Sequence, residues 1–305
     1  YHIGFIGPVS RSTLADANER RDWRIFQDFG QILIRIAQRL YHDEPFALEL
    51  NQPLYAFDST TIDLCLSLFP WAEFRKTKAA VKMHTLIDLR GTIRMLDTLS
   101  VTEDAIYTMD RAYIDFARLY TLHQQGAYFV VRAKDNLRFK RLYSSPKDKE
   151  AGIKADQTVV LVTYKSKKDY PGKLRRVSYV DKKRNKHLVF LTNNFALPAP
   201  VIAEIYKQRW QVELFFKWIK QHLRIKTFYG TSINAVKSQI WVALSIYLLI
   251  VIAKKRLGIS CQLYTFLQIL EVNLFEKKPI PSMVADALKR NPDSQHGNQL
   301  NLFSY

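Results

Sequence analysis

Apolar and polar positions follow different spacings along the chain, and each spacing predicts a different kind of element. Residues 10–42 carry apolar side chains among acids and arginines at helical spacing, so they predict helices. Residues 54–110 contain runs such as LYAFDST and VKMHTLIDLRG, which predict strands. In the second run, Lys82 and His84 alternate with apolar neighbours, as in a strand with one buried face.

Residues 127–195 predict an antiparallel sheet. Turn-rich and strongly basic segments, KSKKDYPGK and DKKRNK, separate runs that are alternating or apolar. These runs are AYFVVRAK, QTVVLVTYKS, KLRRVSYVD and KHLVFLTNN. Solvated turns often carry such charge, but no acids balance these cations, so contact with a polyanion is favoured.

Residues 205–223, IYKQRWQVELFFKWIKQHL, predict one helix with two distinct faces. One face is apolar and points to the core; it consists of Ile205, Val212, Phe215, Ile219 and Leu223. At about 100° per residue, a second set falls within roughly 60° on a different face. That set is Tyr206, Arg209, Glu213 and Lys220.

The apolar run IWVALSIYLLIVIA, residues 240–253, predicts a buried core helix, because a bilayer span needs about 20 residues. A capping C-terminal helix is expected in KRLGISCQLYTFLQILEVNLF, with Gly258 breaking the chain before it. The polar residues 291–305 are expected to be disordered.

Charge narrows the class of partner. The chain has 46 Lys and Arg residues against 28 Asp and Glu residues, a net charge of +18, so it favours a polyanion. No basic amphipathic helix lies beside an apolar anchor, which favours nucleic acid over a membrane. Cys65 and Cys261 stand far apart, which argues against a disulfide framework or a zinc site. The chain has no Gly-rich phosphate loop, so nucleotide-driven chemistry has no support.

Three acids are candidates for catalysis. Asp58 and Asp110 each lie at or near the end of a predicted strand, and Glu213 lies on the polar face of the predicted helix. Carboxylates from separate elements can hold Mg²⁺, and two such ions can assist phosphoryl chemistry. Spacing leaves other acids open as ligands, namely Asp63, Asp88, Asp97, Asp104 and Asp115. Glu213 could instead form ordinary surface pairs with Lys217 and Lys220.

The spacing Tyr-x2-Arg-x3-Glu-x6-Lys, preceded by DST at Asp58 and DRAY at Asp110, resembles the DDE transposases of the insertion-sequence-four family. The resemblance runs from PVSRSTLADANE to about YTFLQILEV. It implies an α/β fold: an RNase H-like mixed sheet flanked by helices, with an antiparallel β-rich insertion before the glutamate helix.

By this resemblance Asp58, Asp110 and Glu213 are the catalytic and metal-binding residues. Tyr206, Arg209 and Lys220 support them, and the two cations contact DNA phosphates. The expected cofactor is Mg²⁺, with Mn²⁺ able to substitute. The expected activity is two-metal-ion phosphodiester hydrolysis and strand transfer in cut-and-paste transposition.

The expected partner is double-stranded DNA, both transposon ends and target DNA, bound by a homodimer, with neither a membrane nor a nucleotide involved. The expected location is the cytoplasm of a prokaryote, in association with the nucleoid. Two alternatives remain: a decayed, inactive transposase that only binds DNA, and another two-metal nuclease of the same fold.

The expected segments follow the family pattern. They are a helical N-terminal remnant of a DNA-binding region (1–50), the first part of the core (51–126), the β-rich insertion (127–200), the second part of the core with C-terminal helices (201–280) and a polar tail (281–305). SRSTLADANERRDW resembles the tail of the upstream DNA-binding region, so the chain is expected to be a piece of a longer product.

One departure from the family pattern concerns residues 92–105, TIRMLDTLSVTEDA. The family has a strand and then a helix here, but a crossover between parallel strands needs a dozen or more residues by itself. We therefore expect the strand between Ile93 and Arg94 to be lost, as in a decayed copy. The alternative is a short strand at Ile93–Leu99 with the helix lost instead.

Aromatic side chains suggest further roles. Some relatives stack a flipped base on a Trp of the insertion, and Tyr164, Tyr170 or Phe139 could substitute here. Trp210 and Trp218 are expected to pack in the core, and His84 is expected to be structural.

Overall fold

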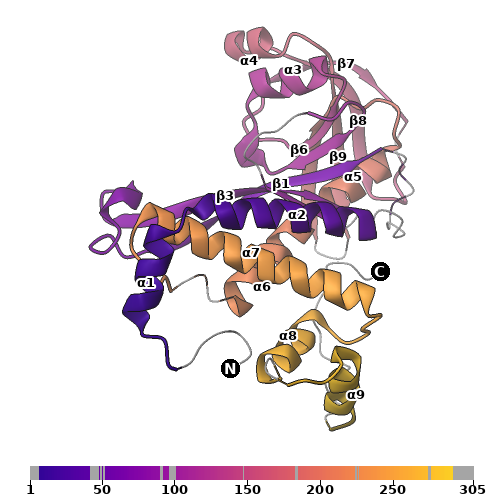
Figure 1. Ribbon diagram of the computed structural model, residues 1–305. Helices are drawn as coiled ribbons and strands as arrows, with labels where there is room; N and C mark the ends of the chain where they lie inside the picture. Colours follow the sequence, from indigo (N-terminus) through magenta and orange to yellow (C-terminus); the bar gives the residue numbers. More distant parts are fainter. Residues whose placement is uncertain are drawn as a thin grey trace. The chain divides into compact units, whose positions relative to one another are not determined.

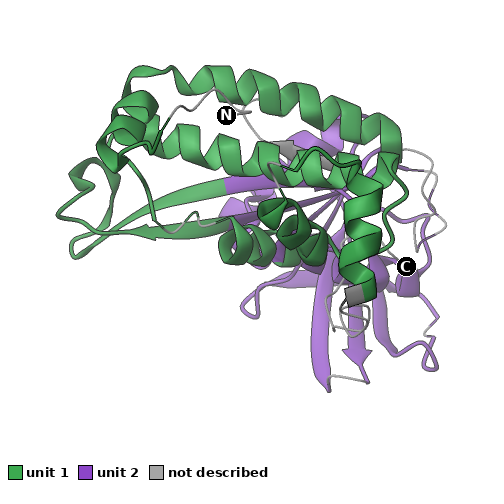
Figure 2. Cartoon of the chain, turned by 60° about the horizontal axis from the view of Figure 1, so that its bottom comes forward, with its two compact units in different colours: residues 1–43, 60–83, 214–305 green, residues 44–59, 84–213 purple. Residues whose placement is uncertain are grey.

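The structure is a computed structural model (Figure 1). It describes residues 7–41, 48, 50, 52–89, 92–95, 101–146, 148–182, 185–223, 225, 227–273 and 276–290. The chain divides into two units, shown in Figure 2. Unit 1 comprises residues 1–43, 60–83 and 214–305, and unit 2 comprises residues 44–59 and 84–213. The expected segment boundaries stay predictions.

Unit 1 is mainly helical. Its elements are α1 (Arg11–Arg20), α2 (Trp23–Tyr41), the η1 turn (Pro70–Ala72), β2 (Glu73–Arg75), most of α6 (Trp210–His222), α7 (Ile233–Arg256), α8 (Leu263–Val272) and α9 (Ile280–Arg290). The predicted helical region contains α1 and α2, and α2 packs along α7 (Figure 1). The side chain of Asn234 closes the α1–α2 corner: its Nδ2 donates to the carbonyl oxygen of Arg21 at 2.6 Å and its Oδ1 accepts from the Trp23 N–H at 3.2 Å.

Helix α7 is the core helix of unit 1. It is 24 residues long, more than the predicted 240–253 run, and by length and composition it could cross a membrane. In this chain 72% of its apolar window is buried against other residues. The prediction of a buried core helix is therefore confirmed. Gly258 follows α7 with a φ of +62°, which places the break before α8 where it was predicted.

Unit 2 is built on a mixed sheet. The strands of this sheet run in the order β2-β3-β1-β5-β6-β10-β9-β8-β7, and β4 pairs with β3 off this path. Besides β2, they are β1 (Leu54–Leu64), β3 (Lys78–Asp88), β4 (Thr92–Met95), β5 (Ile106–Met109), β6 (Tyr128–Arg132), β7 (Phe139–Ser144), β8 (Ile153–Leu161), β9 (Leu174–Asp181) and β10 (Lys186–Thr192). Residues 60–64 of β1 and 78–83 of β3 belong to unit 1. The helices of unit 2 are α3 (Phe116–Gln124), α4 (Tyr164–Asp169) and α5 (Ala199–Gln208), with the η2 turn (Arg111–Tyr113). This is an RNase H-like fold, as predicted.

Both faces of the central strands are buried. Leu54, Ile106 and Val130 lie in one apolar cluster with residues of α5. Their chain neighbours Tyr55 and Tyr107 lie in another cluster, with residues of α3. Because successive strand residues point to opposite faces, the sheet is covered on both sides, as the parallel strands β1, β5 and β6 require.

Two expectations about the strands differ from the structure. Strand β4 pairs antiparallel with β3, so the predicted loss of the strand at Ile93 and Arg94 is wrong, and the alternative of a short strand is right for Thr92–Met95. The residues from 96 to 100 lie outside the described part of the chain. The run AYFVVRAK was expected to belong to the antiparallel sheet, but β6 pairs parallel with β5 and antiparallel with β10. One strand therefore joins the two halves, and the sheet continues without a break.

A buried ion pair fastens the antiparallel strands to the segment that leads into α5. Arg175 on β9 makes two hydrogen bonds to Asp156 on β8, at 2.9 and 2.7 Å. The same guanidinium donates to the carbonyl oxygen of Leu197 at 2.5 Å. The side chains of Arg175 and Asp156 are only 10% and 9% exposed, so neither charge has water as a substitute partner.

We expect Asp156→Asn to lower the free energy of unfolding by about 3–5 kcal/mol, because it leaves a buried guanidinium without its counter-charge. Denaturant titration followed by circular dichroism measures this. The control is Glu204→Gln, which removes a pair with Lys207 whose side chains are 37% and 39% exposed; its effect should stay within about 1 kcal/mol. Equal losses for the two variants would contradict the anchoring role.

Candidate active site

Two aspartates are brought together by the register of parallel strands. Strands β1 and β5 pair so that Phe57 lies opposite Met109. Asp58 and Asp110 are the next residues on the two strands, so they occupy neighbouring positions at one edge. Strand β5 ends there, as predicted, whereas β1 continues past Asp58 to Leu64, so the expectation that Asp58 lies near a strand end is wrong.

The carboxylate of Asp110 is held by its own turn and by α5. Its Oδ1 accepts a hydrogen bond from the Arg111 N–H at 2.7 Å, which caps the η2 turn. The Tyr206 hydroxyl on α5 donates to the same Oδ1 at 3.3 Å. Burial raises the pKa of Tyr206, so its phenol keeps the proton that it donates.

The predicted helix 205–223 is two helices, α5 and α6, with a tight turn at Arg209. The N–H of Arg209 donates to the Tyr206 carbonyl at 3.2 Å, and the Val212 N–H donates to the Arg209 carbonyl at 3.1 Å. These three-residue steps tighten the backbone without leaving the helical region, because Arg209 keeps φ −53° and ψ −29°. The predicted apolar face is buried at Ile205, Val212, Phe215 and Ile219, while Leu223 is half-buried.

Arg209 joins two of the three candidate acids. One terminal nitrogen donates to Oδ2 of Asp58 at 2.5 Å and the other donates to Oε1 of Glu213 at 2.6 Å. The side chain of Arg209 is 11% exposed, that of Asp58 is 15% exposed and that of Glu213 is 36% exposed. The guanidinium also lies over the ring of Tyr206, at 5.5 Å from its centre.

Electrostatics at this site reflect crowded negative charge. Burial raises the pKa of Asp58, and the charges of Glu213 and Asp110 raise it further, while the Ser59 N–H and Arg209 lower it. Burial by itself lowers the pKa of Arg209, but its anionic neighbours and Tyr206 leave that pKa raised. The site therefore favours a bound cation, and Arg209 is the cation that the chain itself provides.

Lys220, the fourth residue of the predicted polar face, belongs to unit 1. Its Nζ donates to the carbonyl oxygen of Thr61 at 2.8 Å. Its role on DNA stays a prediction.

The other acids that spacing left open as metal ligands differ in their partners and in their positions in the fold. Asp63 pairs with Lys78 at 2.9 Å, Asp115 caps α3, and Asp104 has a φ of +60° and accepts a long hydrogen bond from Gln52. Asp88 lies on β3, and Asp97 lies outside the described residues. None of the three described partners comes from α5 or α6.

An aromatic group that the sequence reasoning missed borders Asp58. Tyr113, three residues after Asp110 in DRAY, packs edge-on against Phe57 at 4.5 Å. Burial raises the pKa of Tyr113, and the charges of Asp58 and Asp110 add to that shift. His84 is exposed rather than a buried structural histidine, and its Nδ1 lies 3.4 Å from the Tyr113 hydroxyl. Only the motif DRAY itself could have pointed to Tyr113.

The aromatic residues that were expected to stack a base or to pack in the core differ in their exposure. Tyr170 is 1% exposed and its hydroxyl bonds to His123 at 2.7 Å, so it has no face for a base. Phe139 lies under the guanidinium of Arg176, and Tyr164 is 87% exposed. Trp218 packs in the core as predicted, but Trp210 is 46% exposed.

The donor set fits a hard divalent cation. Carboxylate oxygens are the ligands that Mg²⁺ prefers, and a cation would stabilise the ionised form of Asp58, whose pKa is raised by burial and by the neighbouring acids. Within the described residues no three His, Cys, Asp or Glu side chains are close enough to hold one ion. A pair of carboxylates together with water molecules would suffice to hold one ion. Arg209 lies between two of the candidate carboxylates, those of Asp58 and Glu213.

Comparisons with known proteins show which sequences this chain is similar to. A family model described as a transposase DDE domain matches residues 50–249, a range that includes all six candidate residues. "Putative transposase y4zB" of Sinorhizobium fredii is 31% identical over 289 residues, covering 88% of this chain and 79% of the relative. "Probable transposase for insertion sequence element IS5377" of Geobacillus stearothermophilus is 30% identical over 219 residues, covering 67% and 57%. "Putative transposase for insertion sequence element IS4SA" of Synechocystis is 24% identical over 261 residues, covering 79% and 71%.

The shifted pKa of Asp58 predicts a pH dependence of stability. The Asp58 carboxyl has a pKa of about 3.8 in the unfolded chain and a higher pKa in the folded chain, so the folded chain binds the proton more tightly. The contribution of this group to stability therefore falls as the pH rises from the unfolded pKa through the folded pKa. We expect Asp58→Asn to be more stable than the unsubstituted chain at neutral pH in EDTA, with the difference vanishing below the unfolded pKa. Denaturant titration at a series of pH values measures this. Asp63→Asn, at an exposed pair, is the control. A less stable Asp58→Asn at neutral pH would contradict the prediction.

Proposed function

This chain belongs to the DDE transposases of insertion sequence elements, and we propose that it cuts DNA at the ends of such an element and joins them to target DNA. The observation that carries the proposal is the grouping of Asp58, Asp110 and Glu213 around the side chains of Arg209 and Tyr206. Few structural purposes explain so many partly buried charges on three different elements.

The three carboxylates would hold Mg²⁺, for which Mn²⁺ would substitute. When bound, the cation would polarise the scissile phosphodiester and offset the charge that develops on it. Asp58 and Asp110 are fixed by backbone hydrogen bonds from Ser59 and Arg111, so their oxygens are oriented before any ligand arrives.

Arg209 and Tyr206 would act on the same phosphate. A guanidinium offers planar paired donors that suit carboxylates and phosphate oxygens alike. In this chain those donors hold Asp58 and Glu213, and Tyr206 lies beneath the guanidinium while donating to Asp110. Lys220 would contribute a further phosphate contact.

The chemistry is a series of exchanges at phosphorus. Water attacks one phosphodiester at the element end, the bond from phosphorus to the 3′ oxygen breaks, and a 3′ hydroxyl is freed. That hydroxyl attacks a phosphodiester of the opposite strand, displaces the 3′ oxygen of the flanking DNA and gives a hairpin. Water then attacks the hairpin phosphodiester and frees the 3′ hydroxyl again. The freed 3′ hydroxyl then attacks target DNA and displaces another 3′ oxygen. The carboxylates and Arg209 serve each exchange in turn because the reacting group is the same.

The wider setting follows from charge and from the relatives. A net charge of +18 supports binding to double-stranded DNA, both transposon ends and target. A homodimer acting on paired ends, in the cytoplasm and near the nucleoid, is part of the proposal. The alternative of a decayed copy loses its main support, since β4 is present. An independent two-metal nuclease would cut without transferring strands.

We expect Asp58→Asn, Asp110→Asn and Glu213→Gln each to abolish Mg²⁺-dependent cleavage and strand transfer while DNA affinity is kept or increased, because each removes a negative charge facing phosphate. Gel analysis of a plasmid carrying the gene with its flanking DNA measures cleavage, and fluorescence anisotropy measures affinity. Asp104→Asn is the control, because asparagine tolerates its φ of +60°. Full cleavage by any one of the three variants would remove that residue from the site.

Arg209 competes with a divalent cation for the same carboxylates, and a second prediction rests on this. We expect Arg209→Gln to bind Mg²⁺ more tightly than the unsubstituted chain, by about tenfold or less if the competition is worth roughly 1 kcal/mol, yet to cleave DNA poorly. Isothermal titration calorimetry measures the affinity. Arg209→Lys keeps the charge without the paired donors, so its Mg²⁺ affinity should lie between those of the unsubstituted chain and Arg209→Gln. Weaker Mg²⁺ binding by Arg209→Gln would show that Arg209 holds the site together rather than competing.

A further inference from the structure

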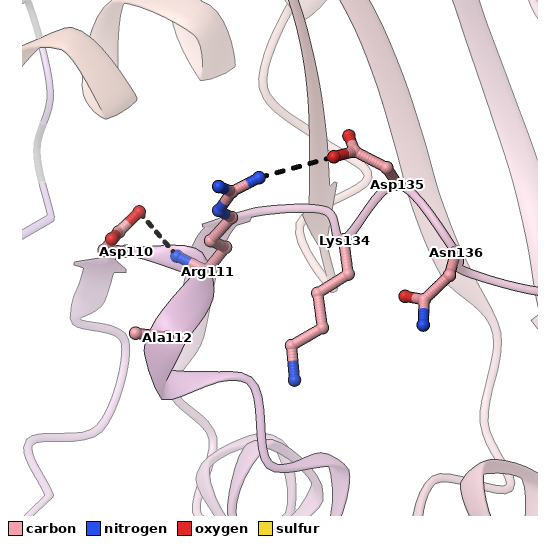
Figure 3. Close-up of a pocket in the computed structure, with 6 residues that line it drawn as sticks. All are labelled: Asp110, Arg111, Ala112, Lys134, Asp135 and Asn136. Carbon is pink, nitrogen blue, oxygen red and sulfur yellow. Dashed lines mark hydrogen bonds and ion pairs between the residues drawn. The ribbon is translucent and has the colours of Figure 1, made fainter.

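A hollow of about 420 Å³ begins at the candidate catalytic residue Asp110. It is lined by Asp110, Arg111, Ala112, Lys134, Asp135 and Asn136 (Figure 3). In the close-up, the Lys134 side chain extends into the space between the Ala112 segment and Asn136 (Figure 3). A single turn after β6 therefore supplies the wall opposite Asp110.

A second hollow of about 750 Å³ continues from the first. Lys134 and Asn136 line both, so the two share a wall. The second hollow also includes Arg138 and, from the start of α4, Thr163, Lys165 and Ser166. Helices α3 and α4 pack beside each other here (Figure 1). Together the two hollows lead from Asp110 to α4.

The cations of this surface are not neutralised. In the described part of the chain the side chains of Lys134, Arg138 and Lys165 have no hydrogen-bond or ion-pair partner, whereas Arg111 pairs with Asp135 at 3.4 Å. When the internal pair and Asp115 are set aside, five exposed or half-exposed charges remain: three cations, Asp169 and the candidate catalytic residue Asp110.

The other acid of the second hollow is already engaged. Asp115 caps α3, accepting from the Arg118 N–H at 3.2 Å, and pairs with the Arg118 side chain at 3.8 Å. Asp110 and Asp169 offset two of the three cations, so one positive charge is in excess, and a divalent cation held by Asp110 would add to it. Asn136, Thr163 and Ser166 add neutral groups of the kind that contact phosphate oxygens.

We propose that these two hollows form a track for the phosphate backbone of one DNA strand, running from Asp110 past Lys134 and Arg138 to Lys165. The inference rests on the proposed function, because Asp110 marks the end at which the strand is cut. Charge complementarity and the continuity of the track with Asp110 select DNA as its occupant. Cations here position the strand and read no sequence, so the track would accept any flanking DNA.

The test is a salt titration of binding to a labelled duplex of mixed sequence, in EDTA so that no cleavage occurs, measured by fluorescence anisotropy. Each lost phosphate contact lowers the slope of log K against log salt by roughly 0.9. We expect Lys134→Ala to lower the slope by about that amount and the triple variant Lys134→Ala, Arg138→Ala, Lys165→Ala to lower it by about three times as much. The control, Lys154→Ala on β8, removes an exposed cation that lines neither hollow and should lower the slope less than Lys134→Ala.

An unchanged slope in the triple variant, or an equal drop for Lys154→Ala and Lys134→Ala, would overturn the track. A triple variant whose slope falls with duplex RNA but is unchanged with duplex DNA would also overturn it. Mg²⁺-dependent cleavage of the plasmid by the unsubstituted chain separates the two proposals. Cleavage by that chain together with an unchanged slope in the triple variant refutes the track alone, whereas absent cleavage with a lowered slope refutes the catalytic proposal and leaves a DNA-binding track. Circular dichroism checks that the exposed substitutions leave the fold intact.

Discussion

The contact of one guanidinium with two carboxylates organises this structure. Asp58 and Glu213 come from a strand and a helix that are 155 positions apart in the chain, and Arg209 bonds to both. Without a cation between them, two partly buried carboxylates would repel each other in a region where water screens poorly. The cation that keeps them close can come from the chain or from solution, and this duality makes the site suitable for metal-dependent chemistry.

The rest of unit 2 fixes the geometry of that contact. Parallel pairing of β1 with β5 sets Asp58 beside Asp110, and the two buried faces of the sheet hold the register, because a slip of one residue would reverse which side chains are buried. Helix α5 carries Tyr206 to Asp110, and the tight turn at Arg209 starts the helix that carries Glu213. The pair of Arg175 with Asp156 fastens the segment before α5 to the antiparallel strands. The strand register and the helix turn therefore position the side chains of the candidate site, and the buried ion pair holds the segment that leads into α5.

Much of this could be predicted from sequence, for identifiable reasons. The helices, the strand runs and the polar stripe of the helix follow from spacing, since helical and strand periods are fixed by backbone geometry. The fold class and the choice of Asp58 and Asp110 came from the resemblance to the transposase family, because spacing left the other acids open. The turn at Arg209 could not be predicted, because the sequence around it has helical spacing throughout. The change is that two backbone hydrogen bonds span three residues instead of four. The parallel pairing of β6 was missed because an apolar run of five residues reads alike in parallel and antiparallel sheets. The strand at Thr92–Met95 was missed because it was judged by the length of its segment, whereas pairing with β3 needs only four residues.

The site also illustrates why a candidate catalytic group need not be a stabilising one. Asp58 has its pKa raised by burial and by the neighbouring acids even though Arg209 is bonded to it, so its ionised form is held against its own preference. The pairing of β1 with β5 keeps Asp58 in this position, because the buried faces of the sheet fix the strand register. Lysine could not replace the guanidinium without loss, because one ammonium is a point charge whereas the planar fork meets two carboxylates along separate directions. The need for one side chain that bonds to both acids explains why an arginine lies at the turn between α5 and α6.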